Sequence, residues 1–305
     1  MMTVNEKWQE QVISWEYDSS ANPNLANIPI QAFPAQLHEE GESRIIELDL
    51  SDVIGTAYPA TTPNLLANYI RIQKGESVKA AVNSSSEVFF VMRGSGYTET
   101  EQGIVEWKQG DAFTLPMNSG VNHHADDSGD AAICWVHDAP MLNYVGAVPS
   151  KPRFQPAFYS KEYLDGEIAR IREAGIRENR NRNGVILGNP GSEKTRTMTP
   201  SLWSLYNLLP KGAIQKPHRH NSVAIDLAVY AKPDVYTMIG KEIDAEGNII
   251  NPVKAMWKSN TVFVTPPGWW HAHYNESDED AYVFPIQDAG VQINMRTLDI
   301  QFVRN

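Results

Sequence analysis

A pattern of short β-type segments that occurs twice constrains the fold of this chain more than any other feature. The segment WKQGDAFTLP, residues 107–116, aligns without a gap to WKSNTVFVTP, residues 257–266. Each begins with Trp-Lys and continues into a run of strand-forming residues that ends in proline. Upstream of each, Lys-Gly follows an apolar run, at residues 74–75 and 211–212. This repeated order of parts indicates one fold used twice.

Both halves of the sequence consist of predicted strands. Residues 43–146 and 194–305 contain short runs rich in Val, Ile, Phe and Tyr, separated by Gly, Asn, Ser and Pro. Closely spaced strands with few helical stretches are typical of a sandwich or barrel. A chain of 305 residues is long enough for two such domains, each with a core of its own. We therefore predict an all-β fold of two barrels.

The remaining segments are predicted to be an arm and a connector. Residues 1–42 precede the first barrel as an N-terminal arm, and residues 147–193 connect the two barrels. In the connector, residues 160–175 begin with a capping serine, contain helically spaced Leu and Ile, and end in glycine, which predicts a helix. The polar, Gly- and Asn-rich stretch that follows is typical of a loop.

The charge and the cysteine content limit which partners and which cellular compartment we expect for the protein. The formal net charge of −11 argues against nucleic acid or an anionic membrane as a partner, because both require clustered Lys and Arg. The single cysteine, Cys134, lies in an apolar run and excludes a disulfide within the chain. The first residues lack the pattern of a signal peptide, and no apolar run is long enough to span a bilayer. We expect a cytoplasmic protein.

Histidines are concentrated in two short segments of the second half. KPHRHNSVAID and TPPGWWHAHYN hold four of the eight histidines in the chain. His218 and His220 would point to the same side of a β-strand, and a returning strand could bring His271 beside them. Three neutral imidazoles leave coordination positions open on a divalent metal, which catalysis requires. The alternative is that HRH is a surface turn and His271 a lone core residue.

The two histidine segments resemble the first and second motifs of the cupin superfamily. Gly212, followed by AIQKP and HRH, matches the first motif, and Pro266, Gly268, His271 and Asn275 match the second. Cupins are jelly-roll β-barrels, so the resemblance implies two cupin domains joined by a short helix and loop. It also implies that the three histidines are metal ligands.

One family ligand is missing from this site. Many cupins carry a glutamate four or five residues after the second histidine, where this chain has Ala224 and Ile225. The resemblance therefore implies a centre with three histidines and no carboxylate ligand.

Among cupins, the sequence resembles the gentisate 1,2-dioxygenase group, with the metal barrel second rather than first. The resemblance covers roughly residues 70–302. It implies Fe(II), with Mn, Zn or Ni as alternatives, and a ring-cleaving reaction of O₂ with a hydroxylated aromatic or similar chelating small molecule. A non-redox metal-dependent enzyme (lyase, isomerase or hydrolase) and a non-catalytic binding protein remain alternatives. We also expect a homo-oligomer.

The first barrel is predicted to lack a metal site. Ala81 and Asn83 occupy the positions of the first two ligands, while Glu87 remains at the glutamate position. His123 and His124 are displaced by two residues from the spacing of the second motif. We expect this barrel to have a structural role.

Three further residues are candidates for a catalytic role. Asp226 stands where gentisate-type enzymes usually have a basic residue, so it would repel an anionic substrate, attract a cation or orient a ligand histidine. His273 shares the strand parity of His271 and could be a spare ligand, a proton shuttle or a rim residue. Tyr236 could donate a hydrogen bond to bound oxygen or substrate. Other candidates for the pocket are Trp269, Trp270, Gln287, Asp288 and Arg296.

Overall fold

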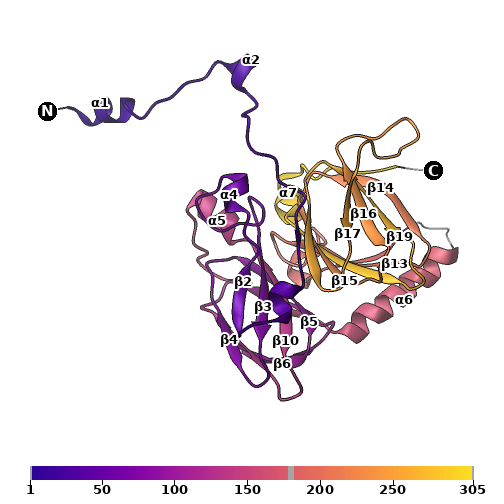
Figure 1. Ribbon diagram of the computed structural model, residues 1–305. Coiled ribbons are helices and arrows are strands. Elements are labelled where there is room, and N and C mark those ends of the chain that lie inside the picture. The colour runs from indigo at the N-terminus through magenta and orange to yellow at the C-terminus, as the bar shows by residue number, and fades with distance from the viewer. Residues whose placement is uncertain (1, 178–181, 304–305) are drawn as a thin grey trace.

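The computed structural model describes residues 2–177 and 182–303 and consists of two β-barrels that lie against each other (Figure 1). The prediction of an all-β fold with one barrel in each half is confirmed. Within the described ranges, no helix is both long and apolar enough to cross a membrane.

The first barrel is built from two antiparallel sheets. Their strand orders are β11-β8-β5-β10-β3-β2 and β4-β9-β6-β7. The bounds are β2 (Arg44–Glu47), β3 (Leu66–Ile72), β4 (Ser77–Ala80), β5 (Ser86–Arg93), β6 (Ser95–Thr100), β7 (Gly103–Lys108), β8 (Ala112–Pro116), β9 (Val121–Ala125), β10 (Ala131–His137) and β11 (Ala157–Tyr159).

The second barrel repeats this arrangement. Its sheets have the orders β1-β18-β15-β20-β13-β12 and β17-β16-β19-β14-β21. The bounds are β1 (Ala32–Phe33), β12 (Asn183–Leu187), β13 (Trp203–Leu209), β14 (Ile214–His220), β15 (Ala224–Tyr230), β16 (Val235–Gly240), β17 (Val253–Met256), β18 (Thr261–Thr265), β19 (Trp270–Asn275), β20 (Ala281–Gln287) and β21 (Ile300–Phe302).

Short helices lie outside the barrels, and the longest of them is in the connector. Ser160 begins the connector helix by accepting a hydrogen bond from the Tyr163 amide (3.1 Å), and the helix continues to Arg177, slightly beyond the predicted end. The helices are α1 (Val4–Gln9), α2 (Tyr17–Ser20), α3 (Gln36–Glu39), α4 (Ser51–Ile54), α5 (Ala139–Val145), α6 (Lys161–Arg177) and α7 (Ala289–Met295), with a 3₁₀ turn at Pro190–Ser192.

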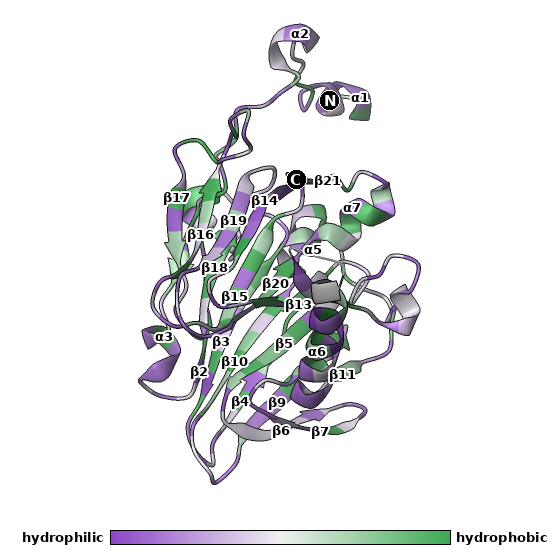
Figure 2. Ribbon diagram, turned by 90° about the vertical axis from the view of Figure 1, so that its right-hand side faces the viewer, coloured by the Kyte–Doolittle hydropathy of each residue, from purple (hydrophilic) through white to green (hydrophobic). Residues whose placement is uncertain are grey.

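The largest apolar core lies between the two barrels rather than within either one. It joins residues of β3, β5 and β10 to residues of β13, β15 and β20, and the rings of Phe90 and Phe284 are 4.9 Å apart across the junction. Figure 2 shows hydrophobic residues along β5, β13 and β20, where the barrels meet. Burial of so much apolar surface makes the two barrels one packed unit.

The arm and the connector are also part of the sheets. The N-terminal arm supplies β1 to the second barrel, and the connector supplies β11 to the first barrel and β12 to the second. The hydroxyl of Tyr69, on β3, donates to the Phe33 carbonyl (3.0 Å) and accepts from the Val262 amide (2.8 Å). Ile28 and Ile30 of the arm also pack against the apolar cores. The earlier part of the arm extends away from the barrels, with α1 and α2 at the far end (Figure 1).

Two equivalent aspartates join the barrels in opposite directions. Asp138, after β10, accepts a hydrogen bond from the Ser201 hydroxyl of the second half (2.7 Å). Asp288, after β20, accepts one from the Asn64 amide of the first half (2.7 Å) and another from the Val223 backbone amide (3.0 Å). This reciprocal pair supports the interpretation of the repeat as one fold used twice.

Candidate metal centre

Two neighbouring strands bring three histidines together. In the antiparallel pair β14–β19, His218 is directly opposite His271, and His220 projects to the same side two residues further on. The pairing is irregular between Gln215 and His218, around Pro217, which has no amide proton to donate. One possible ligand atom from each histidine lies within 4.8 Å of the others. No other such group of His, Cys, Asp or Glu exists among the described residues.

The ring orientations of two of these histidines suit metal binding. Nδ1 of His220 contacts the Ser222 carbonyl oxygen (2.8 Å), and Nδ1 of His271 contacts the Trp269 carbonyl oxygen (3.1 Å). A carbonyl only accepts, so each Nδ1 must donate, which leaves Nε2 free as a ligand. Burial lowers the pKa of His220 and holds the pKa values of His218 and His271 well below their usual range. Neutral, clustered imidazoles are a donor set that fits a divalent transition metal.

Sequence reasoning missed Arg182, which is the cation of this site. From the connector, its guanidinium donates to Nδ1 of His218 (3.1 Å) and to the Lys216 carbonyl, and it lies 4.9 Å from the Phe302 ring centroid. Burial lowers the pKa of Arg182 to about 10, so it is protonated at neutral pH. Its Nε is buried without a hydrogen-bond partner among the described residues. No sequence signal distinguishes Arg182 from its neighbours in the arginine-rich loop RENRNRNG.

The histidines form one wall of a pocket of about 240 Å³ inside the second barrel. His273 and Asp226 line this pocket, as does Gln287, whose amide nitrogen is 3.4 Å from Nε2 of His220. Asp288 does not line it, because its carboxylate is bonded at the junction between the barrels. The other lining residues are Arg182, Gly184, Ile186, Trp203, Leu205, Asn207, Gln215, Val283, Pro285, Ile300 and Phe302.

Asp226 faces the pocket from β15, as its parity with Ala224 predicts. It is paired with Phe263 on one side and Pro285 on the other, and it accepts a hydrogen bond from the Thr265 hydroxyl (2.6 Å). No ligand histidine is bonded to it among the described residues, so the suggested role in orienting a histidine is not supported. Burial raises the pKa of Asp226 to about 7, against the opposing effect of the Thr265 hydrogen bond.

His273 also faces the pocket, outside the three-histidine cluster. Its Nδ1 is 2.9 Å from the hydroxyl of Thr237, on the neighbouring strand β16. Burial lowers the pKa of His273 to about 3, so the ring is neutral.

The prediction for Tyr236 was wrong. Tyr236 pairs with Tyr274, on the opposite face of the sheet from His273, because side chains alternate along a strand. Its hydroxyl donates to Glu276 (2.7 Å), and its ring stacks on Tyr274 with centroids 5.0 Å apart. Tyr236 therefore does not reach the pocket.

Three other candidates also lie away from the pocket. Trp269 is partly buried against an apolar core of the second barrel, with Lys241 over its ring, and Trp270 lies under Arg219. Arg296 is exposed in the left-handed cap of α7.

The first barrel has no comparable group of ligands. Its strand register places His123 where the second barrel has His273, so Val121, opposite Ala80, takes the place of His271. Phe89, at the register position of Asp226, stacks between Phe113 and Trp135 with centroids 4.7 and 5.8 Å away. Aromatic rings thus fill the space around Phe89. A pocket of about 400 Å³ remains at the corresponding end of the first barrel, lined by Leu66, Asn68, Trp135 and His137 among others, but neither Phe89 nor His123 lines it.

Glu87, at the register position of Ala224, is buried in the first barrel. It accepts hydrogen bonds from Ser84 (3.0 Å), Asn118 (2.7 Å) and the Trp135 indole (2.9 Å). Burial raises its pKa to about 7.

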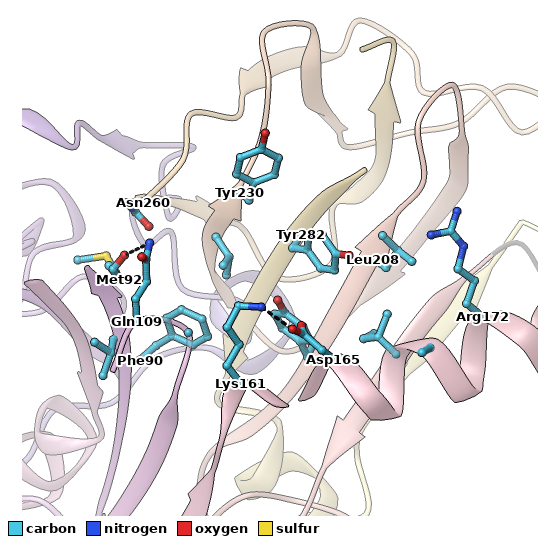
Figure 3. A pocket seen from close by; sticks show the side chains of 16 residues that line it. Phe90, Met92, Gln109, Lys161, Asp165, Arg172, Leu208, Tyr230, Asn260 and Tyr282 are labelled. Atoms are coloured by element: carbon cyan, nitrogen blue, oxygen red, sulfur yellow. Dashed lines mark hydrogen bonds and ion pairs between the residues drawn. The ribbon is translucent and has the colours of Figure 1, made fainter. Parts of the chain in front are cut away.

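A larger cleft of about 580 Å³ lies between the barrels and α6, as Figure 3 shows. Tyr206 and Tyr282 stack there with centroids 5.5 Å apart. Its charged side chains are already paired, Lys161 with Asp165 and Arg172 with the nearby Asp280 (2.5 Å). The histidine pocket is therefore the stronger candidate for chemistry.

Fold and site together give two packed β-barrels with a cluster of three histidines in the second barrel. No protein family model matches the chain. Over 160 residues (50% of this chain, 40% of the relative) it is 28% identical to gentisate 1,2-dioxygenase 1 of Aquipseudomonas alcaligenes. Over 87 residues (28% of this chain, 42% of the relative) it is 29% identical to 5-nitrosalicylic acid 1,2-dioxygenase of Bradyrhizobium sp.. The chain thus spans less than half the length of either relative.

Solved structures extend the likeness to the whole fold. The salicylate 1,2-dioxygenase of Pseudaminobacter salicylatoxidans superposes with a TM-score of 0.74 at 14% identity, covering 98% of this chain and 96% of that one. Vicilin of Corylus avellana gives 0.55 at 12% identity, covering 89% and 87%. The chain therefore has the two-barrel fold of the salicylate 1,2-dioxygenase, and part of its sequence is similar to gentisate and 5-nitrosalicylic acid 1,2-dioxygenases.

Proposed function

We propose that this protein is a metal-dependent dioxygenase that opens the ring of a hydroxylated aromatic acid. The observation that carries the proposal is the three-histidine cluster at the wall of a pocket, in a chain that is similar to gentisate and salicylate 1,2-dioxygenases. The same pocket brings together a cation, a neutral histidine and a buried carboxyl group.

In this proposal His218, His220 and His271 hold one divalent ion, with Fe(II) as the native metal and Mn, Zn or Ni as alternatives. Bound Fe(II) would supply the one-electron chemistry with O₂ that amino-acid side chains lack. If Nε2 of His218 binds the ion, Nδ1 must carry a proton and can no longer accept from Arg182. The guanidinium is then available for a substrate.

Arg182 and Asp226 define the class of substrate. Arg182 is the only cationic side chain among the described residues that line the pocket, so we assign it to the substrate carboxylate. Asp226 faces the same space, and it favours a substituent that donates a hydrogen bond, such as a hydroxyl or amino group. The proposed substrate is a hydroxybenzoate with such a substituent on the side facing Asp226.

The cellular location and the oligomeric state are proposed on separate grounds. The single cysteine is free and buried, which is compatible with a cytoplasmic location. Aromatic side chains of the extended arm, including Trp8 and Trp15, are more than two-thirds exposed, at 70% and 74%, which supports contact with a second copy of the chain.

Oxygen uptake tests the function directly. Protein purified without oxygen and loaded with Fe(II) is assayed against salicylate, gentisate and aminosalicylates, with the product absorbance measured in parallel. We expect uptake of one O₂ per aromatic acid consumed, and loss of uptake when His271→Ala removes a ligand. Arg182→Gln should weaken substrate binding about tenfold or more, because a charge-assisted contact is lost, whereas Arg172→Gln in the other cleft should not. Substrate turnover without O₂ would instead support a non-redox cupin enzyme.

A further inference from the structure

His273 ends a chain of three side chains that runs through the wall of the second barrel. The indole nitrogen of Trp257 donates to the Thr237 hydroxyl oxygen (2.8 Å), and that oxygen is 2.9 Å from Nδ1 of His273. Thr237 is fully buried. Within residues 2–177 and 182–303 its hydroxyl has no other hydrogen-bond partner.

The donors and acceptors in this chain can be assigned without ambiguity. An indole N–H only donates, so Thr237 must be the acceptor in its bond with Trp257. A buried hydroxyl that is not used as a donor leaves its proton without a hydrogen-bond partner, which is unfavourable away from water. The one remaining partner for that proton is Nδ1 of His273. Nδ1 must therefore be unprotonated, and the single proton of the neutral ring must be on Nε2.

We propose that Trp257 and Thr237 are positioning residues that fix His273 as the Nε2–H tautomer, so that it donates a hydrogen bond to the molecule bound in the pocket. The identity of that molecule rests on the proposed function, but the tautomer does not. With Nδ1 turned to the wall, Nε2 is the nitrogen left for the pocket that His273 lines.

The first barrel contains the same three side chains, but there the histidine ring packs against Phe89 and Phe113. Trp107 donates to the Thr98 hydroxyl (2.8 Å), which is 2.7 Å from Nδ1 of His123. Nε2 of His123 is buried without a partner, and its ring centroid is 5.1 Å from that of Phe89. The repeat shows that the chain of hydrogen bonds belongs to the barrel fold. Only in the second barrel, where Asp226 replaces Phe89 in the register, does the fixed proton face a space for a ligand.

The donor role complements the other polar groups of the pocket. A fixed N–H beside Arg182 and Asp226 gives a hydroxybenzoate one cation, one donor and one carboxyl group as separate partners. A ring free to exchange tautomers would present a lone pair part of the time, and it would then repel a phenolate or carboxylate oxygen. The proposed effect of Thr237 is therefore on binding of the aromatic acid.

Histidine tautomers are measured directly by two-bond ¹H–¹⁵N NMR spectra of the full chain, labelled at histidine and loaded with diamagnetic Zn²⁺. The signals that disappear in His273→Asn identify His273. We expect the wild-type protein and Thr237→Ser to show an unprotonated Nδ1 and a protonated Nε2, and Thr237→Val to show a mixture of tautomers. The matched control, Thr98→Val in the first barrel, should alter His123 signals only. A protonated Nδ1 in the wild type, or an unchanged His273 pattern in Thr237→Val, would overturn the proposal.

Salicylate binding to the same Zn²⁺-loaded variants, measured by calorimetry, tests the consequence. Thr237→Val should weaken binding about tenfold, Thr237→Ser and Thr98→Val should not, and adding Thr237→Val to His273→Asn should cause no further loss. If Thr237→Val weakens salicylate binding equally in the wild type and in His273→Asn, Thr237 does not act through His273, and the proposal is contradicted. If Thr237→Val lowers the zinc content, Trp257→Phe serves as the second variant. A wild-type protein that binds no aromatic acid would refute the proposed function, while the NMR spectra would still decide the tautomer.

Discussion

At the scale of single residues, the interior of the second barrel differs from that of the first through a few substitutions at shared register positions. Asp226 stands in the second barrel where Phe89 stands in the first, and His271 stands where the first barrel has Val121. Each change replaces an apolar side chain with a polar one that faces the interior. At these positions the same strand framework thus gives an apolar core in one half and the wall of a polar pocket in the other.

Asp226 should select for a donor group on the substrate. We expect an aminosalicylate whose amino group faces Asp226 to bind about tenfold or more tightly than salicylate, because a hydrogen bond to a carboxylate contributes about 1.5–3 kcal/mol. Asp226→Asn should reduce this preference and Asp226→Arg should reverse it in favour of dicarboxylates, as measured by calorimetry. Asp244→Asn, on an exposed turn, is the control. An unchanged preference in Asp226→Arg would mean that the substrate does not approach Asp226.

Glu87 should make stability depend on pH. Its pKa is raised in the folded protein to about 7 from 4.5, so its contribution to stability is fully present below about pH 4.5 and is lost as pH rises through 7. Glu87→Gln cannot ionise, so the free energy of unfolding of the variant relative to wild type should rise with pH between about 4.5 and 7. The slope should approach at most about 1.4 kcal/mol per pH unit. Urea unfolding at four pH values measures this slope, and Glu106→Gln, at an exposed position, is the control. If the free energy of unfolding changes with pH in the same way in the wild type and in Glu87→Gln, the raised pKa of Glu87 is contradicted.

At the scale of elements, segments outside the barrels complete the sheets. The arm strand β1 extends a sheet of the second barrel, and Tyr69 of the first barrel ties it to β18. The connector strand β12 begins one residue after Arg182, so sheet pairing also positions the cation of the pocket. The connector is therefore both a link between the barrels and a wall of the site.

Removing the Tyr69 hydroxyl should loosen this attachment. Tyr69→Phe leaves the Phe33 carbonyl and the Val262 amide without their partner, and we expect it to lower the free energy of unfolding by about 1–3 kcal/mol. Tyr230→Phe removes a hydroxyl that is bonded to Glu279 at the surface, and it should cost less than about 0.5 kcal/mol. Denaturant unfolding measures both changes. Equal effects would show that the buried bonds of Tyr69 do not hold the arm.

At the scale of the whole molecule, the two barrels share one core but differ in chemistry. The sheets that contain β5 and β15 pack on each other, and the Asp138 and Asp288 bonds close the junction from both sides. The three-histidine group occurs in the second barrel alone, within the described parts of the chain. The three-histidine group thus lies in the second barrel, and the first barrel packs against the sheet that carries Asp226.

Metal content should reflect this asymmetry. Anaerobically loaded wild-type protein should bind about one divalent ion per chain, with metal–nitrogen distances of about 2.0–2.2 Å. His220→Ala should bring the metal content close to zero without changing the far-UV circular dichroism spectrum, and His124→Ala in the first barrel should leave it unchanged. Elemental analysis measures the content. A second equivalent of metal, or full metal content in His220→Ala, would refute the assignment.

The sequence by itself determined the strand content, the repeat and the three histidines, because strand periodicity and turn residues act over short distances and leave a direct pattern. It also placed Asp226 on the inner face, since parity along a strand is a local property. Only the tertiary structure decided which side chains meet. The approach of Arg182 depends on how a connector loop packs against β14, and the orientation of Tyr236 depends on which face of β16 is turned inward. The attachment of the arm to the second barrel likewise depends on pairing between residues far apart in the chain, for which a single sequence has no local signal.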